Sequence, residues 1–111
     1  MNLIQFQRIA KALSDPRRFE VLEVIAESGS ELSCGAVVER FPVAQATISH
    51  HLKELVEAGL VETRSEGQFK YLSARSDVLE EYTSELRRRL TPSLNKQKKS
   101  KSADQRKPAG A

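Results

Sequence analysis

The stretch from Val43 to Val61 constrains the fold of this chain more than any other segment. Its apolar residues recur at three- and four-residue spacing, the period that gathers side chains on one face of a helix. These residues are Ile48, Leu52, Leu55 and Val56. Gly59 stands where a helix ends in a left-handed residue, and Leu60 then begins an extended run. A helix, a glycine and a strand in this order predict a winged helix.

The opposite face of this helix carries small or polar residues and one lysine, where a solvated helix normally carries more charge. Amide, hydroxyl and imidazole groups can enter the DNA major groove and hydrogen-bond base edges and phosphates. The candidate DNA-binding residues of this helix are Gln45, Ala46, Thr47, Ser49, His50 and Lys53. Position 44, the natural place for a helix cap, is alanine, which gives up roughly 1 kcal/mol that Ser or Asp would supply.

Three helices are predicted before this segment. The first covers residues 3–13, and the second begins at Pro16, with Asp15 as its cap, and stops at the turn 28–30. Ser33 can cap a third, short helix that runs as far as Pro42, whose ring cannot continue it. Because only a few residues join the third helix to the fourth, the pair forms a helix-turn-helix.

Two extended runs, residues 60–64 and 69–72, follow the helix-turn-helix and flank a turn over residues 65–68 that contains a glycine. We expect a two-stranded antiparallel wing here. Arg64, Gln68 and Lys70 would lie on it and could reach phosphates or a minor groove, although such residues are also ordinary on a hairpin surface. With a fifth helix from Ser76 to just before Pro92, the fold class is mainly α with a small β-hairpin (α+β).

Both terminal helices carry apolar stripes, and a body this small rarely needs two such stripes to complete one core. We therefore expect a helical dimer interface in which at least one stripe packs against a second copy of the chain. The alternative is that both stripes only cover the monomer. The candidate interface residues are Leu3, Phe6, Ile9, Leu79, Tyr82 and Leu86.

The positive charge of the chain is concentrated at its C-terminal end. The formal net charge is +3, but residues 95–111 hold six Lys/Arg against one Asp, which leaves −2 for the rest. From Ser93 onward the composition is that of a disordered segment. We expect one DNA-binding and dimerisation domain over residues 1–92 and a basic tail over 93–111. The tail could strengthen DNA binding by counterion release or serve only as a solubilising extension.

Several function classes are disfavoured by what the sequence lacks. No nucleophile and base pair, phosphate-binding glycine loop or metal cluster is visible, so we expect neither an enzyme nor a cofactor. No stretch has the apolar length of a membrane span or a signal peptide, and the single Cys34 fits a reducing compartment, so we expect a cytoplasmic protein. Cys34 is interpreted as a semi-buried cysteine that acts as a small hydrophobe, with a redox switch as the alternative.

The adjacent histidines His50 and His51 invite a metal site, but neighbours in a helix point about 100° apart and cannot share one ion. We interpret His51 as a packed residue that anchors the helix, while His50 faces outward. Neither histidine is therefore expected to be a metal ligand.

Three blocks of this sequence resemble the ArsR/SmtB family of bacterial winged-helix repressors. They are residues 13–18 (LSDPRR), 45–52 (QATISHHL) and 58–61 (AGLV), in the order and spacing typical of that family. The resemblance extends over nearly all of residues 3–90. It implies a homodimer built from the first and last helices, with each fourth helix in a major groove and each wing beside it.

Many members of that family sense metals through a Cys-x-Cys pair at the start of the third helix. An alignment without gaps places the two ligand positions at Ser33 and Gly35, with Cys34 between them. Glycine has no ligating side-chain atom, and a neutral serine hydroxyl is a poor ligand for soft or borderline metals. The other common family site needs histidine on the last helix, which has none. The resemblance thus implies a member without the known metal ligands, which either lacks a sensor or senses an effector that this sequence does not display. Some relatives of that kind act as autorepressors or are released by a partner protein.

These observations together predict a sequence-specific, DNA-binding transcriptional regulator. The most direct interpretation is a homodimeric repressor that occupies an inverted-repeat operator in double-stranded DNA. The alternatives are a winged helix used as a protein-interaction module and a nonspecific DNA binder, because winged helices serve both uses.

Overall fold

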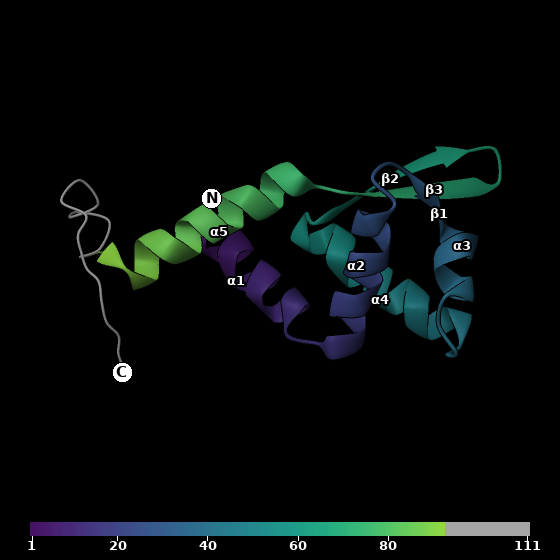
Figure 1. Cartoon of the computed structure of the whole chain (residues 1–111), viewed down its shortest axis with the longest axis horizontal. Helices are drawn as coiled ribbons and strands as arrows, with labels where there is room; N and C mark the ends of the chain where they lie inside the picture. Colours follow the sequence, from purple (N-terminus) through teal and green to yellow (C-terminus); the bar gives the residue numbers. More distant parts are fainter. Residues whose placement is uncertain (93–111) are drawn as a thin grey trace.

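Five helices and a three-stranded antiparallel sheet build the fold of the computed structural model (Figure 1). The structure describes residues 1–92, and the expected basic tail over residues 93–111 lies outside them. In chain order the elements are α1 (Leu3–Leu13), α2 (Pro16–Glu27), β1 (Leu32–Ser33), α3 (Cys34–Glu39), α4 (Gln45–Ala58), β2 (Val61–Glu66), β3 (Phe69–Ala74) and α5 (Ser76–Leu90).

Local capping chemistry sets most of the helix boundaries as expected. The Asp15 carboxylate accepts a 2.9 Å hydrogen bond from the backbone N–H of Arg18 at the start of α2. The Ser33 hydroxyl accepts a 3.1 Å bond from the N–H of Ala36 at the start of α3. Ala44 precedes α4 and makes no capping hydrogen bond, because its side chain has no acceptor atom. The predicted starts of α2 and α3 are thus confirmed, whereas α3 ends at Glu39, before the expected limit at Pro42.

The sheet has the strand order β1-β3-β2, so the prediction of a two-stranded wing was wrong in its strand count. The additional strand, β1, pairs Leu32 with Leu72 of β3. Two residues are too short to show the alternation by which strands are recognised in sequence. β2 and β3 form the hairpin, and its turn is two residues long instead of the four expected, because residues 65 and 66 continue β2.

The core lies where α1, α2 and α4 meet beneath the sheet. Its fully buried side chains are Ile9, Val21, Ile25, Val37, Ile48, Leu55, Leu60 and Leu72. On α4 the expected apolar stripe is confirmed at three positions, whereas Val56 lies at its margin and is 36% exposed. On α2, Phe19 is apolar but 44% exposed. α2 carries apolar residues on several sides, so only its neighbours decide which side is buried.

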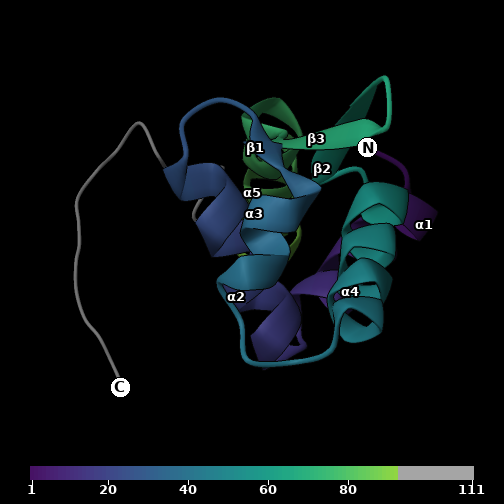
Figure 2. The same ribbon diagram turned by 90° about the vertical axis from the view of Figure 1, so that its right-hand side faces the viewer.

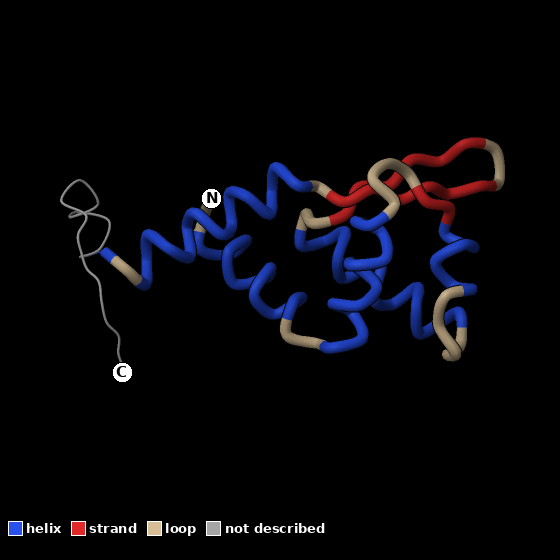
Figure 3. Tube along the Cα trace, in the orientation of Figure 1, coloured by secondary structure: helices blue, strands red, loops and turns tan. Residues whose placement is uncertain are grey.

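The two ends of the molecule are built from different elements (Figures 1 and 3). α1 and α5 lie together at one end, and the hairpin of β2 and β3 projects at the other. α2, α3 and α4 lie on one side of the sheet, and none of the helices in residues 1–92 covers its opposite side. No helix in residues 1–92 is long and apolar enough to cross a membrane.

Candidate nucleic-acid interface

α4 separates its residues into two faces as the sequence predicts. The inward face contacts α1 and α2 and buries Ile48, His51, Leu52 and Leu55. All six predicted DNA-binding residues of the helix are exposed: Gln45, Ala46, Thr47, Ser49, His50 and Lys53. Their side chains present amide, hydroxyl, imidazole and ammonium groups to solvent along one helix, the groups that hydrogen-bond base edges and phosphates. The packing of the inner face therefore fixes which groups the outer face offers.

His51 is 8% exposed, and its Nδ1 has no hydrogen-bond partner among the described residues. Burial lowers the pKa of His51 below its ordinary value, while the Asp15 carboxylate acts in the opposite direction and Arg18 adds to the lowering. The side chain is therefore held as the neutral imidazole in the interior. Its burial agrees with an anchoring role for this residue, and His50 beside it is exposed.

At the tip of the wing, Gln68 and Lys70 are exposed on either side of Phe69, whose side chain is 60% exposed. Gly67 forms the turn with Gln68 and adopts φ +62°, a left-handed conformation that favours glycine. Phe69 is not among the predicted site residues, although an aromatic residue directly after a turn, among polar neighbours, is a signal for it. Here an apolar ring is available to a partner that approaches the wing.

Arg64, the third predicted wing residue, is already bound by carboxylates. Its Nε and Nη2 donate to the two oxygens of Glu31 at 2.7 and 2.8 Å, and its Nη1 donates to Glu66 at 2.7 Å. The guanidinium also lies 4.8 Å from the ring centre of Tyr71. These hydrogen bonds, Glu31 first and Glu66 second, raise the pKa of Arg64, and Arg64 lowers the pKa of Glu31. The positive charge of Arg64 is thus already paired with the carboxylates of Glu31 and Glu66 within the protein.

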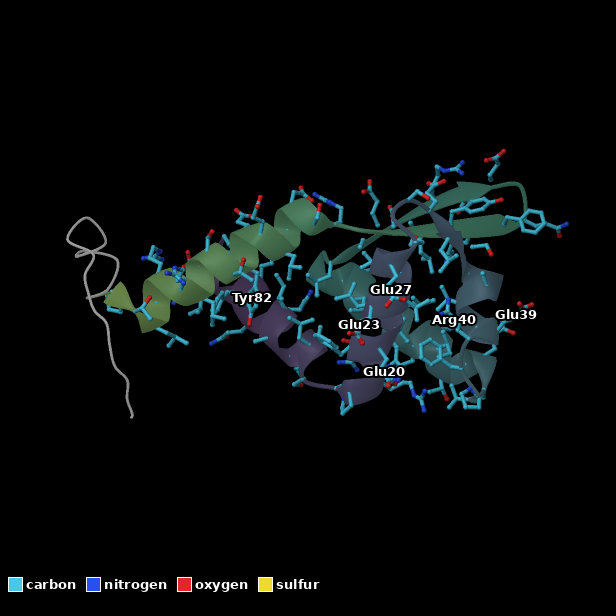
Figure 4. The ribbon with its side chains drawn as sticks, viewed as in Figure 1. Glu20, Glu23, Glu27, Glu39, Arg40 and Tyr82 are labelled. Atoms are coloured by element: carbon cyan, nitrogen blue, oxygen red, sulfur yellow. The ribbon has the colours of Figure 1, made fainter. Side chains whose placement is uncertain are left out.

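The distribution of charge distinguishes the sides of the molecule. Figure 4 shows Glu20, Glu23 and Glu27 along one side of α2, where their carboxylates disfavour the approach of phosphates. Figure 2 shows α4 and the hairpin on the same side of the molecule, with α2 and α3 beside them. We define the α4–wing surface as the six exposed residues of α4 together with Gln68, Phe69 and Lys70. This surface extends from α4 onto the wing. It presents polar groups and has no row of carboxylates like the one on α2.

The predicted dimer residues fall into three groups. Leu3 and Leu79 are 49% and 42% exposed, and Phe6 and Leu86 are half-buried. Tyr82 is 8% exposed and points from α5 toward α1 (Figure 4). Ile9 has no exposed surface in the single chain, so the expectation that it meets a partner is corrected, and we assign it to the core. Its position on α1 faces α4 instead.

The positions at the start of α3 offer little to a metal ion. The Ser33 hydroxyl caps the helix, Gly35 has no side chain, and Cys34 is a half-buried free thiol. Within residues 1–92, no group of three or more His, Cys, Asp or Glu side chains is arranged to hold a metal.

Comparison with known proteins gives consistent results. A family model described as a helix-turn-helix domain matches residues 13–64. The chain is 44% identical over 75 residues to the uncharacterized HTH-type transcriptional regulator YceK of Bacillus subtilis strain 168, over 68% of this chain and 75% of that protein. It is 34% identical over 73 residues to the transcriptional repressor SdpR of the same strain, over 66% and 79% of the two chains.

Solved structures show the same fold. An ArsR-like transcriptional regulator from Rhodococcus sp. RHA1 superimposes with a TM-score of 0.71 at 23% identity, over 90% of this chain and 96% of that one. A possible ArsR-family regulator from Mycobacterium bovis, a homodimeric winged helix-turn-helix DNA-binding domain, gives a TM-score of 0.63 at 28% identity, over 86% and 82% of the two chains. Both structures therefore share the overall fold of this chain.

Proposed function

Because this chain belongs to the ArsR family of winged helix-turn-helix transcriptional regulators, we propose that it is a homodimeric repressor that occupies an inverted-repeat operator. One observation carries the proposal. The outward face of α4 exposes its six predicted DNA-binding residues, of which Lys53 alone is a lysine or arginine, while the inward face buries Ile48, His51, Leu52 and Leu55. A surface that offers amides and hydroxyls, with little charge, is suited to reading base edges rather than only to attracting phosphates.

The exposed apolar side chains at the other end of the molecule support dimerisation. Leu3 and Ile4 on α1 are 49% and 73% exposed, and Leu79 and Leu90 on α5 are 42% and 72% exposed. Association through these helices would bury them. The relative from Mycobacterium bovis is itself homodimeric. A two-fold dimer would read half-sites about 34–36 Å apart, or a multiple of that distance.

The proposal is tested by selecting sheared genomic DNA on the purified protein at physiological salt, with excess nonspecific competitor, and sequencing what stays bound. We expect a few fragments that share an inverted repeat. The variant with Gln45, Thr47 and Ser49 all changed to alanine should keep its fold by circular dichroism and lose this preference. Gln7→Ala, an exposed amide on α1, is the matched control and should retain it.

Diffuse recovery of fragments by the wild-type protein would contradict a sequence-specific repressor and favour a nonspecific binder. If the triple variant behaved as the wild-type protein does, the α4–wing surface would not be the reading surface, and a protein-interaction module would be the better description. Enzymatic activity is not part of the proposal, since the relatives are regulators.

We further propose that release from DNA does not use the Cys-x-Cys position of metal-sensing relatives. The Ser33 hydroxyl is engaged in the cap of α3, and Gly35 supplies no ligand. Adding Zn²⁺ or arsenite should therefore leave operator affinity unchanged. A metal-dependent loss of affinity would show that another set of ligands exists.

The basic segment is assigned a separate role. Six Lys/Arg against one Asp in residues 95–111 would add nonspecific affinity through counterion release, outside the domain over residues 1–92. Deleting residues 95–111 should weaken binding to all sequences alike and flatten its salt dependence. Loss of preference for the operator alone would contradict this role.

A further inference from the structure

We infer that Glu31 is a positioning residue for the wing, acting through Arg64, and that Arg64 is a structural tether rather than a phosphate contact. The inference rests on the proposed binding of DNA by the α4–wing surface. It changes the role of Arg64 from the one that sequence suggests, and it gives Glu31, a loop residue, a part in DNA recognition.

Carboxylates accept hydrogen bonds from three of the five N–H donors of Arg64. The side of the guanidinium formed by Nε and Nη2 meets both oxygens of Glu31, the two-pronged geometry in which arginine binds a carboxylate with the greatest specificity. Nη1 is bound to Glu66, two residues along the same strand. The face of the guanidinium stacks on Tyr71, its cross-strand partner. A phosphate that used the edge formed by Nε and Nη2 would have to displace Glu31.

Charge opposes such a displacement. One guanidinium lies between two carboxylates, so the cluster of Glu31, Arg64 and Glu66 has a formal net charge of −1. Glu62, two residues before Arg64 on β2, adds a further carboxylate and lies 3.9 Å from Arg75. A phosphate brought to this cluster would meet an excess of negative charge.

Strand register places the cluster on the outer face of the hairpin. Paired residues of an antiparallel ladder share a face, and Arg64 pairs with Tyr71 while Ser65 pairs with Lys70. Lys70 and Leu72 are two apart on β3 and share the other face, which the helices cover, because Leu72 is 1% exposed. Arg64 therefore points away from the helices, whereas Lys70 lies on the side of the hairpin that faces the helix-turn-helix.

Glu31 lies in the connection between α2 and β1, immediately before the helix-turn-helix. Its ion pair with Arg64 joins residues that are 33 positions apart and ties the middle of β2 to that connection. The tether restricts the angle between the hairpin and α3. A hairpin held in one orientation loses less conformational freedom when it meets DNA, and binding is stronger for that reason.

The experiment measures affinity for the selected operator as a function of salt concentration for Glu31→Gln, Arg64→Gln and Lys70→Gln. A tether predicts that Glu31→Gln weakens binding, roughly three- to tenfold, the size expected when one or two side chains must be ordered on binding. Arg64→Gln should weaken binding by a similar factor and leave the salt slope unchanged. The double variant with Glu31→Gln and Arg64→Gln should bind no more weakly than either single variant. Lys70→Gln should reduce the slope by about 0.9, as the loss of one phosphate contact does.

The opposite role for Arg64 predicts the opposite sign. If Arg64 bound phosphate, Glu31→Gln would free it, so that affinity and salt slope would both rise, and Arg64→Gln would lower the slope. Either result overturns the inference. Glu62→Gln is the matched control, because it removes a carboxylate from the same face without touching Arg64, and it should not weaken binding.

A second measurement separates this inference from the proposed function. Hydrogen exchange of the wing amides in the free protein needs no operator, and Glu31→Gln and Arg64→Gln should both accelerate it, while Glu62→Gln should not. If the wild-type protein bound no operator but exchange were accelerated, the repressor proposal would fail and the tether would stand. Unchanged exchange in both variants would refute the tether whatever the DNA result.

Discussion

The rings of Phe6 in α1 and Tyr82 in α5 lie 5.1 Å apart, with their planes tilted by 34°. This contact joins the two terminal helices within one protomer. The guanidinium of Arg89 lies 4.8 Å from the centre of the Phe6 ring, on the same joint. Tyr82 therefore completes the fold of the single chain, whereas Leu79, one turn earlier on α5, is 42% exposed. The two residues allow folding and dimerisation to be tested separately.

Tyr82→Ala should destabilise the protomer, because it removes a buried ring from the joint between α1 and α5. The loss in the free energy of unfolding should be about 3 kcal/mol, as for other buried aromatic side chains. Urea denaturation followed by circular dichroism at low protein concentration measures it. Leu79→Ala should instead weaken self-association in sedimentation experiments and leave the protomer nearly as stable.

The same two variants also test whether dimerisation contributes to stability. If a dimer forms through α1 and α5, the urea midpoint of the wild-type protein rises with protein concentration, and that of Leu79→Ala rises less. A Tyr82→Ala variant that dissociated the dimer without lowering the stability of the protomer would show that Tyr82 meets the partner instead.

The fold was largely predictable where independent local rules agree. α4 has apolar spacing, a terminal glycine and a following strand, and the structure places Ile48 and Leu55 in the core and Gly59 in the left-handed region at φ +87°. The rules fail where one signal acts alone. Phe19 and Val21 are both apolar residues of α2, and only the arrangement of the neighbouring helices decides that Val21 is buried and Phe19 exposed.

The candidate site shows the same limit. The exposure of the polar face of α4 follows from its period, so those residues were predictable. The partners of Arg64 were not, because Glu31 is 33 positions away and reaches it through a loop whose path depends on the whole fold. Charge counted along the sequence gave Arg64 the same weight as Lys70, and only the cross-strand register separates them.

His51 gives the stability a defined dependence on pH. Burial lowers its pKa in the folded protein below the ordinary 6.5, an effect that Asp15 opposes and Arg18, His50 and Arg17 reinforce. As the pH falls, the unfolded chain therefore takes up this proton first. The free energy of unfolding should be constant in this respect above about pH 6.5 and should decrease as the pH falls toward the folded pKa.

Urea denaturation at about pH 7.5 and 5.5 measures this dependence, a range in which histidine is the main side chain to titrate. His51→Gln should remove most of the decrease at the lower pH. His50→Gln, a change at the exposed neighbour, should retain it. An equal loss of the decrease in both variants would show that burial of His51 is not its cause.

The missing cap of α4 should be open to improvement. Ala44 has φ −64° and ψ 147°, the extended conformation that suits a capping residue, but it has no side-chain acceptor. Ala44→Thr should raise the free energy of unfolding by about 1 kcal/mol, because the hydroxyl can accept a hydrogen bond from the first turn. Ala44→Val has the same shape without the hydroxyl and should bring no gain. Equal stabilities of the two variants in urea would contradict a capping effect.

Gly59, which ends α4, should tolerate substitution less well than Gly67 at the wing turn. Both have positive φ, +87° and +62°, so alanine at either position costs about 1–2 kcal/mol of backbone strain. A Cβ on Gly59 would in addition lie 3.0 Å from Nε2 of Gln5, whereas one on Gly67 would meet nothing within 4 Å. Gly59→Ala should therefore be the more destabilising change in urea denaturation.

The Gln5 side chain identifies the source of the difference. In a Gln5→Ala background the close contact is absent, so Gly59→Ala should cost no more than Gly67→Ala, and the two changes at positions 5 and 59 should be non-additive. Gly67→Ala should cost the same with or without Gln5, because the wing turn is distant from α1. If removing Gln5 left the cost of Gly59→Ala unchanged, backbone strain at the end of α4 would account for the whole effect.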